Sequence, residues 1–501
     1  MSESRILGGI LFKLKKVFPI TLAAIGAFTA LSMWAFASPP GSGPDDDFHL
    51  PSIWCSHGQV DGICDPEFAG DGYGKTPTPL SPSAICFAFK SDQSAACQAN
   101  MFDWQDKKLS GSRTNEEGRF PNGFYWTLNF LIGDNTLNSA MLMRIFNSLL
   151  AVSLLFMTAI FATPRSRVSL IASWAVVSVP LAMFTIASTN PSSWSIIGIG
   201  TYWVSLLSYL RSKNLKYSIV NGVLLFISGL IAIQSRSEAS PYLILSTLIV
   251  LIIHFNWKEL FSLNKKFILP TIVVLLAFYE FLTTPSTLGW STGLPGGDPN
   301  RSSRELWFRN ISDWPTFITG SLGGWPLGWL DVPMPSMVYF CAMFAFIGVL
   351  FTGLLNLNWR KSIAILLIVS TLVILPLRIL ALGKNYVGEN VQPRYFLPLL
   401  FLLVGIAVFS PKNVEAFYLS YAQVIVAAFF VTSAHAFALH FTMRRYLTGS
   451  DVVDWNLNKN VEWWWSFMPS PMTSWALASL GFAIAVSVGL WQLRKPVKED
   501  Y

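Results

Sequence analysis

The chain has 501 residues, of which 52% are hydrophobic and only 13% are charged. Soluble globular domains usually carry about 25% charged residues, so this composition excludes an ordinary soluble enzyme and indicates a membrane protein. The net charge of +7 comes from short segments between apolar runs, which excludes a disordered chain and a nucleic-acid-binding domain.

Windows of mainly apolar residues predict transmembrane helices, because crossing about 30 Å of hydrocarbon takes about 20 helical residues. Twelve such windows occur, at residues 17–37, 139–162, 168–188, 193–210, 217–233, 241–255, 267–283, 336–355, 362–382, 395–409, 417–440 and 472–493. The expected fold is all-α and polytopic, with about twelve transmembrane helices.

The first window follows four cations and ends in Ala35-Phe36-Ala37, which matches a signal-peptide cleavage site. The apolar run is longer than the core of a typical signal peptide, and polytopic proteins usually retain their first helix. We therefore interpret this segment as a retained membrane anchor.

The distribution of charge predicts the orientation. With the N-terminus in the cytoplasm, the cytoplasmic segments hold 18 lysines and arginines and five acidic residues. This excess follows the positive-inside rule and places both termini in the cytoplasm. We expect a bacterial cytoplasmic membrane protein whose active face is extracytoplasmic.

The long connecting segments then lie outside, where loops of this length tend to be functional. The expected parts are a cytoplasmic N-terminus with the first helix (1–37), a first outer loop (38–138), helices two to seven (139–283), a second outer loop (284–335), helices eight to eleven (336–440), a third outer segment (441–471), and the last helix with a cytoplasmic tail (472–501).

Four of the five cysteines lie in the first outer loop, at Cys55, Cys64, Cys86 and Cys97. Thiols in an oxidising compartment form disulfides, so we expect two bonds in one of three pairings. A zinc site that includes His57 is the alternative, but the sequence has no C-x-x-C pair to favour it.

An acidic cluster opens the first outer loop. Asp45, Asp46 and Asp47 follow a segment rich in proline and glycine, and His49 comes two residues later. Adjacent carboxylates repel, which raises and spreads their pKa values and suits a general base or a ligand of a divalent metal such as Mg²⁺ or Mn²⁺. A solvated polar turn at the end of a helix is the simpler interpretation.

Other charged residues lie near the membrane boundary. Arg144, Glu280 and Arg378 fall in or at the ends of apolar windows, where charged groups usually face a cavity or a partner. Arg236 and Glu238 connect the fifth and sixth windows on the outer side. Arg394, followed by Tyr395, either binds a phosphate through two donors or anchors the helix among lipid headgroups.

Several short motifs in order along the chain resemble those of the GT-C superfamily of integral-membrane glycosyltransferases, in a bacterial subgroup of uncharacterised proteins. They are D-E-x-x-H (Asp45 to His49, with Asp46 in place of Glu), N-P-S (Asn190 to Ser192), R-x-E-A (Arg236 to Ala239), G-x-L-D-x-x-x-P (Gly328 onward, with Asp331) and Q-G-R-Y-x-x-P (Gln392 to Pro398, with Pro393 in place of Gly).

The resemblance implies an inverting hexosyl- or pentosyltransferase of cell-envelope polysaccharide biosynthesis. The expected partners are membrane lipids, a polyprenyl-phosphate sugar donor and a glycan or lipid-linked acceptor. Asp45 or Asp46 would act as the base, and Arg394, Arg236 and His49 would bind the donor phosphate. Glu238, Asp331, Tyr395 and Asn190 are expected to contact substrate. No cofactor is required, although the three aspartates permit a divalent metal.

Two other classes of protein fit the same layout. A transporter or flippase of lipid-linked sugars also has about twelve spans, but it should show repeated halves, and the sequence has no internal repeat. A cell-wall polymer ligase would use the same kind of donor and differ in its acceptor.

Overall fold

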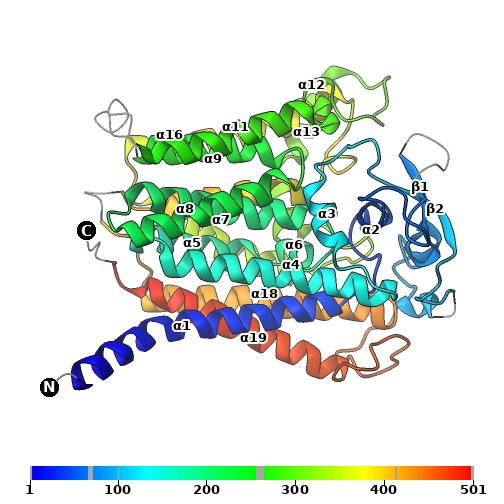
Figure 1. Cartoon of the computed structure of the whole chain (residues 1–501), viewed down its shortest axis with the longest axis horizontal. Coiled ribbons are helices and arrows are strands. Elements are labelled where there is room, and N and C mark those ends of the chain that lie inside the picture. The colour runs from blue at the N-terminus through cyan, green and yellow to red at the C-terminus, as the bar shows by residue number, and fades with distance from the viewer. Residues whose placement is uncertain (1–2, 66–71, 100, 255–264, 412–414, 498–501) are drawn as a thin grey trace.

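The computed structural model describes residues 3–65, 72–99, 101–254, 265–411 and 415–497. Its long helices run roughly parallel, and both chain termini lie at the same end of the bundle (Figure 1). The opposite end, here called the loop end, carries the short helices and strands that follow the first long helix. This arrangement agrees with the predicted topology, in which both termini share one side of the membrane.

Eight helices in the described part of the chain are long and apolar enough to cross a membrane. They are α1 (Glu3–Phe36), α4 (Thr136–Phe161), α8 (Leu215–Ile233), α11 (Ile268–Thr283) together with the turn Lys265–Phe267 before it, α15 (Ser336–Leu354), α16 (Trp359–Leu382), α18 (Tyr421–Leu447) and α19 (Pro471–Trp491). The protein is therefore a multi-pass integral membrane protein.

The remaining predicted spans fall on other helices, which are α5 (Pro164–Val177) with α6 (Leu181–Ile186), α7 (Ser192–Arg211), α9 (Ala239–His254) and α17 (Leu397–Val408). The prediction of one continuous helix over 168–188 is wrong, because Pro180 lies between α5 and α6 and has no N–H to continue the helical hydrogen bonds. The 12 residues of α17 extend only about 18 Å, and all of them are buried.

Polar residues start several of the long helices. Asn214 accepts hydrogen bonds from two backbone N–H groups at the start of α8, and Asn358 accepts one at the start of α16. At the start of α18, Ser420 and Gln423 form a reciprocal capping box. These side chains satisfy N–H groups that a helix end leaves without partners.

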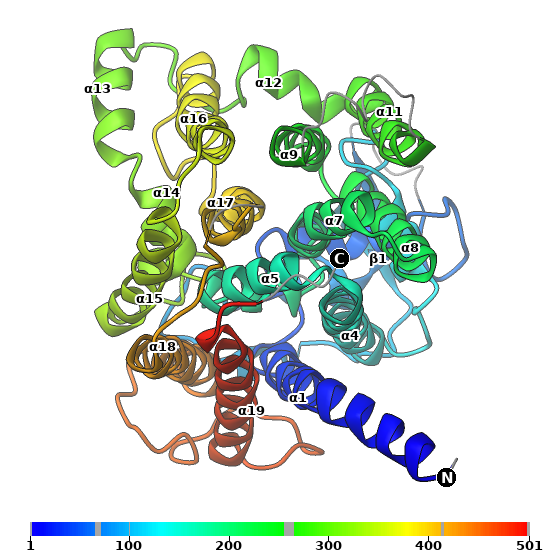
Figure 2. The same cartoon turned by 90° about the vertical axis from the view of Figure 1, so that its left-hand side faces the viewer.

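The long helices pack in pairs, with α1 against α19 and α4, α7 against α8, and α15 against α18 (Figure 2). Gly26 of α1 and Gly481 of α19 face each other so closely that a Cβ added at either would collide with the other's backbone. Small residues at a helix crossing let membrane helices approach closely. This contact holds the first and last helices of the chain together.

The loop end contains α2 (Asp46–Trp54), α3 (Gly123–Asn129) and an antiparallel pair of strands, β1 (Tyr73–Pro77) and β2 (Leu109–Arg113). The second long loop contributes α12 (Gly289–Thr292), α13 (Ser303–Asp313) and α14 (Thr316–Thr319). Single helical turns lie at Thr78–Leu80, Pro82–Ala84, Ala95–Gln98, Lys265–Phe267, Pro285–Leu288, Gly320–Gly324, Pro393–Phe396 and Gln492–Arg494.

The predicted disulfides are confirmed, and the pairing is Cys55 with Cys64 and Cys86 with Cys97. Cys341 is free and buried in α15. Lys258, Lys412 and Lys498, which contribute to the predicted cytoplasmic charge, lie outside the described residues.

Candidate active site at the loop end

The turn that follows α1 is held by a buried arginine. Arg144 of α4 is 1% exposed and donates hydrogen bonds to the carbonyl oxygens of Ala35, Ser38 and Pro39 at 3.1, 2.8 and 2.8 Å. A cation is favourable at a helix C-terminus, where carbonyl groups lack helical partners. Arg144 therefore fixes the direction in which the chain leaves the membrane.

Two of the predicted motifs support the next residues of the chain. Asn190 donates from Nδ2 to the carbonyl oxygen of Pro44 at 2.7 Å, and Trp329 donates from Nε1 to that of Gly41 at 2.7 Å. The N-P-S and G-x-L-D motifs thus contact the backbone just before Asp45.

Asp45 and Arg394 form an ion pair across the site. Nη2 of Arg394 donates to Oδ2 of Asp45 at 2.6 Å, a short charge-assisted hydrogen bond. Asp45 has a φ of +59°, a left-handed conformation that aspartate tolerates better than most residues. Its side chain is 45% exposed, whereas that of Arg394 is 8% exposed. The carboxylate is therefore the accessible member of the pair.

The surrounding charges keep Asp45 ionised. Burial raises its pKa, but the guanidinium groups of Arg394 and Arg236 outweigh this effect and hold the pKa below its ordinary value. Arg394 has donor capacity left, because its buried Nε has no hydrogen-bond partner in the protein.

The ring of Tyr395 lies close to two arginine side chains. The guanidinium carbons of Arg236 and Arg394 lie 4.5 and 4.9 Å from the centre of its ring, and its hydroxyl accepts a 3.2 Å hydrogen bond from Nη2 of Arg394. Glu238 forms a 2.6 Å ion pair with Arg236. The structure thus brings together five of the predicted residues, all near the loop end.

Asp46 is fully buried and faces the protein. Its two carboxylate oxygens accept hydrogen bonds from the backbone N–H of Gly43 at 2.9 Å and the hydroxyl of Thr189 at 2.8 Å, and Arg144 lies 3.8 Å away. Burial raises the pKa of Asp46 despite the opposing effect of Arg144. This position leaves its carboxylate without access to solvent.

The three aspartates do not fit a shared metal ion. Asp45 bonds to Arg394, Asp46 points into the protein, and Asp47 forms a 2.6 Å ion pair with Arg113 of β2. A divalent cation needs several oxygens directed at one point, and these carboxylates are directed at three different partners. We therefore derive no step that requires a metal at this cluster.

His49 is buried beside Asp45 and stacks on Tyr125 of α3. Its Nδ1 lies 2.9 Å from the Tyr125 hydroxyl, and the planes of the two rings are 23° apart. Burial lowers the pKa of His49 to about 3, so the imidazole is neutral at physiological pH. The ring of Phe120 lies next to both His49 and Arg236.

Asp331 lies apart from the Asp45–Arg394 pair. It is 4% exposed, and its Oδ2 accepts a 2.7 Å hydrogen bond from Nη2 of Arg445 at the end of α18. Arg445 also donates to the carbonyl oxygens of Phe87, Lys90 and Gln93, inside the loop closed by the second disulfide. The pair joins three separate segments at the loop end.

Sequence reasoning did not identify Thr189, Arg113, Tyr125 or Arg445. Thr189 directly precedes the N-P-S motif, and this adjacency was the available signal. The other three lie in segments without a recognisable pattern, and only the tertiary structure brings them to the site.

These features define an integral membrane protein with a charged, partly accessible site at one end of its helix bundle. The chain belongs to the family of predicted membrane proteins DUF2142, whose model matches residues 28–403. No curated protein matches it. Among solved structures, the chain is similar to ArnT from Cupriavidus metallidurans bound to undecaprenyl phosphate, with 12% identity over 95% of this chain and 76% of ArnT and a TM-score of 0.42.

Proposed function

We propose that the protein is an inverting GT-C-type glycosyltransferase that moves a sugar from a polyprenyl-phosphate donor to a glycan or lipid-linked acceptor. The observation that carries this proposal is the Asp45–Arg394 pair, which joins an accessible carboxylate to a guanidinium with an unused buried donor. The reaction requires one group of each kind, a base for the acceptor hydroxyl and a cation for the leaving phosphate.

In the proposed reaction, Asp45 accepts the proton of the acceptor hydroxyl while that oxygen attacks the anomeric carbon of the donor sugar. The bond from the anomeric carbon to the phosphate oxygen breaks, and polyprenyl phosphate leaves with the bonding electrons. Arg394 and Arg236 stabilise the negative charge that develops on the phosphate. One displacement inverts the configuration at the anomeric carbon.

The ion pair between Asp45 and Arg394 links binding of the donor to the basicity of Asp45. Donor phosphate competes with Asp45 for the guanidinium of Arg394. When Arg394 turns to the phosphate, the carboxylate loses the cation that lowers its pKa and becomes a stronger base. Donor binding thus prepares the base for the acceptor.

The other predicted residues take supporting roles. His49, neutral and buried, orients the segment of Asp45 rather than carrying charge to the phosphate. Tyr395 and Glu238 position the two arginines, and Asn190 holds Pro44. Asp331 acts through the loop that its partner Arg445 binds.

We assign the site to the extracytoplasmic face of a bacterial cytoplasmic membrane. The predicted charge asymmetry supports this assignment, as do two disulfides at the loop end, because such bonds persist in oxidising compartments. The grouping of Asp45, Arg236 and Arg394 at one end of the bundle favours an enzyme over a transporter, whose substrate site would lie near the middle of the membrane.

The proposal is tested with membranes that contain the wild type, Asp45→Asn or Asp46→Asn and a panel of labelled polyprenyl-phosphate hexoses and pentoses. We expect Asp45→Asn to lower transfer by about 10²- to 10⁴-fold, the usual contribution of a general base. Asp46→Asn should retain transfer per folded molecule. Transfer by Asp45→Asn at the wild-type rate would refute the assignment of the base, and absence of transfer by the wild type with every donor would refute the activity.

A further inference from the structure

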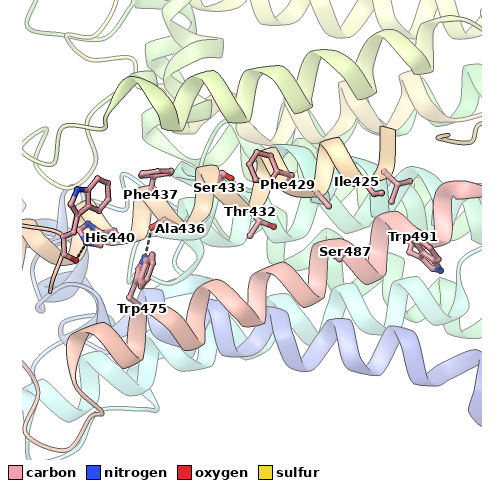
Figure 3. Close-up of a pocket in the computed structure, with 13 residues that line it drawn as sticks. Ile425, Phe429, Thr432, Ser433, Ala436, Phe437, His440, Trp475, Ser487 and Trp491 are labelled. Atoms are coloured by element: carbon pink, nitrogen blue, oxygen red, sulfur yellow. Dashed lines mark hydrogen bonds between the residues drawn. The ribbon is translucent and has the colours of Figure 1, made fainter. Parts of the chain in front are cut away.

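A long apolar groove follows α18 and α19 and shares no lining residue with the Asp45 site. Its volume is about 680 Å³, and α18 lines it with residues three or four positions apart, including Ile425, Phe429, Thr432, Ala436 and His440 (Figure 3). Residues at this spacing lie on one face of a helix. The groove therefore extends continuously along one face of α18 and is not a local depression.

The groove has the length expected of a lipid-binding site and tryptophan side chains at both ends. Its α18 lining extends from Val424 to His440, or about 24 Å at 1.5 Å per residue, against about 30 Å of hydrocarbon. Trp491 and Trp475 lie at opposite ends of the groove (Figure 3), and Trp455 lies beside His440 at the end that holds Trp475. Tryptophan is enriched at both membrane surfaces, so the groove spans most of the apolar layer.

His440 gives one end of the groove a specific chemistry. The side chain is 4% exposed, and its Nε2 lies 2.9 Å from the carbonyl oxygen of Trp455. A carbonyl oxygen only accepts, so Nε2 carries the proton and Nδ1 is left as an acceptor. Nδ1 is buried and has no hydrogen-bond partner in the protein. The groove therefore ends at a histidine whose buried Nδ1 acceptor is unsatisfied, next to the rings of Trp455 and Trp475.

The absence of charge among the described lining residues limits which lipid headgroup the groove can bind. None of the described residues that line the groove is charged. At the end that holds His440, Arg444 lies one turn beyond the lining and donates to the backbone carbonyl oxygens of residues 454, 456 and 459. An uncharged hydroxyl satisfies Nδ1 of His440 without leaving a buried charge.

We propose that this groove binds a long-chain lipid alcohol, with its chain along α18 and its hydroxyl donating to Nδ1 of His440. The site does not depend on the proposed transfer reaction, because it uses different residues and a ligand without phosphate. The lipid alcohol would occupy a groove that has tryptophan at both ends and no role in the proposed reaction at Asp45.

The test uses the purified full-length protein in detergent and two photoreactive probes, a diazirine-bearing C20 isoprenoid alcohol and its methyl ether. Labelled peptides are mapped by mass spectrometry. We expect the alcohol to label α18 and α19 about fivefold more than the ether, as one hydrogen bond to a buried acceptor implies. In His440→Phe this ratio should fall to within about twofold, and being a ratio it does not depend on the amount of folded protein.

A second pair of variants tests the groove itself. Ala428→Trp fills the groove and should abolish labelling of α18 and α19. Leu480→Trp, at an exposed position outside the lining, should leave the labelling unchanged. Equal labelling by the alcohol and the ether in the wild type would overturn the proposal. So would labelling that survives Ala428→Trp.

Discussion

Nη2 of Arg394 lies 2.6 Å from Oδ2 of Asp45, although 349 positions separate the two residues in the sequence. The contact joins the turn after α1 to the turn before α17, at the loop end of the bundle. Each residue limits the other: the guanidinium keeps the carboxylate ionised, and the carboxylate occupies the donor that an incoming phosphate would use. Binding of an anion and release of a base are thus linked in one pair of side chains.

Substitution of Arg394 should weaken the binding of donor. We expect Arg394→Ala to raise the apparent Kd for a polyprenyl-phosphate sugar by about tenfold or more, because a charge-assisted bond to phosphate contributes about 1.5–3 kcal/mol. The apparent Kd of Arg394→Lys should lie between those of the wild type and Arg394→Ala, since lysine keeps the charge but lacks the planar guanidinium that binds phosphate through two donors. Arg304→Ala, at an exposed position of α13, is the control. Unchanged donor affinity in Arg394→Ala would show that Arg394 does not bind the donor phosphate.

Asp46 should contribute to folding rather than to the reaction. Asp46→Ala leaves the N–H of Gly43 and the hydroxyl of Thr189 unpaired beside a buried guanidinium, and we expect it to lower the free energy of unfolding by about 3–5 kcal/mol. Asp46→Asn keeps an acceptor and should cost less. Thermal unfolding of the purified variants measures both changes. Asp134→Ala, whose ion pair is exposed, should change stability by about 1 kcal/mol or less, and an equal effect of all three substitutions would contradict the prediction.

Stability should fall in mild acid because His49 is buried in its neutral form. Its pKa is about 3 in the folded protein and 6.5 as the ordinary value, so between these values the unfolded chain binds more protons than the folded one. This difference lowers stability as the pH falls below 6.5, by up to about 1.4 kcal/mol per pH unit.

Unfolding temperatures measured from pH 7 to pH 5 test this dependence. His49→Gln should flatten the fall in unfolding temperature relative to the wild type, and the exposed His57→Gln should leave it unchanged. Parallel pH profiles for the wild type and His49→Gln would show that His49 does not contribute to the fall.

Loss of the second disulfide should loosen the loop that Arg445 holds. We expect Cys86→Ser combined with Cys97→Ser to lower stability by about 2–4 kcal/mol, the usual effect of removing a native disulfide. Peptide mapping of the unreduced wild type should recover the Cys55–Cys64 and Cys86–Cys97 pairs. Four free thiols would contradict both the pairing and the proposed oxidising compartment.

Hydropathy predicted the helical membrane class well, because runs of apolar residues are a local property of the sequence. It does not tell which of the apolar helices face lipid. The residues of α17 are buried by protein, and such a helix has the same composition as one that faces lipid. The break at Pro180 was visible as a proline, but a proline in an apolar run either kinks or ends a helix, and composition does not distinguish the two outcomes.

The site was predictable in part. Asp45, Arg236, Arg394 and Tyr395 each lie in a short motif, and the common side predicted for them agrees with their contact in the structure. The difference between Asp45 and Asp46 was not predictable, since it depends on the tertiary partner that each carboxylate contacts. The partners of Asp46 come from α4 and from Thr189, far along the chain.

The distance along the chain between Asp45 and Arg394 also determines when the pair is formed during synthesis. At about 5–20 residues per second, 349 residues take roughly 20–70 s to make, so Asp45 is exposed for most of translation without its cation. A nascent or truncated chain that ends before residue 394 carries the acidic turn but no Arg394. The ion pair therefore forms late in synthesis, after most of the membrane helices have been made.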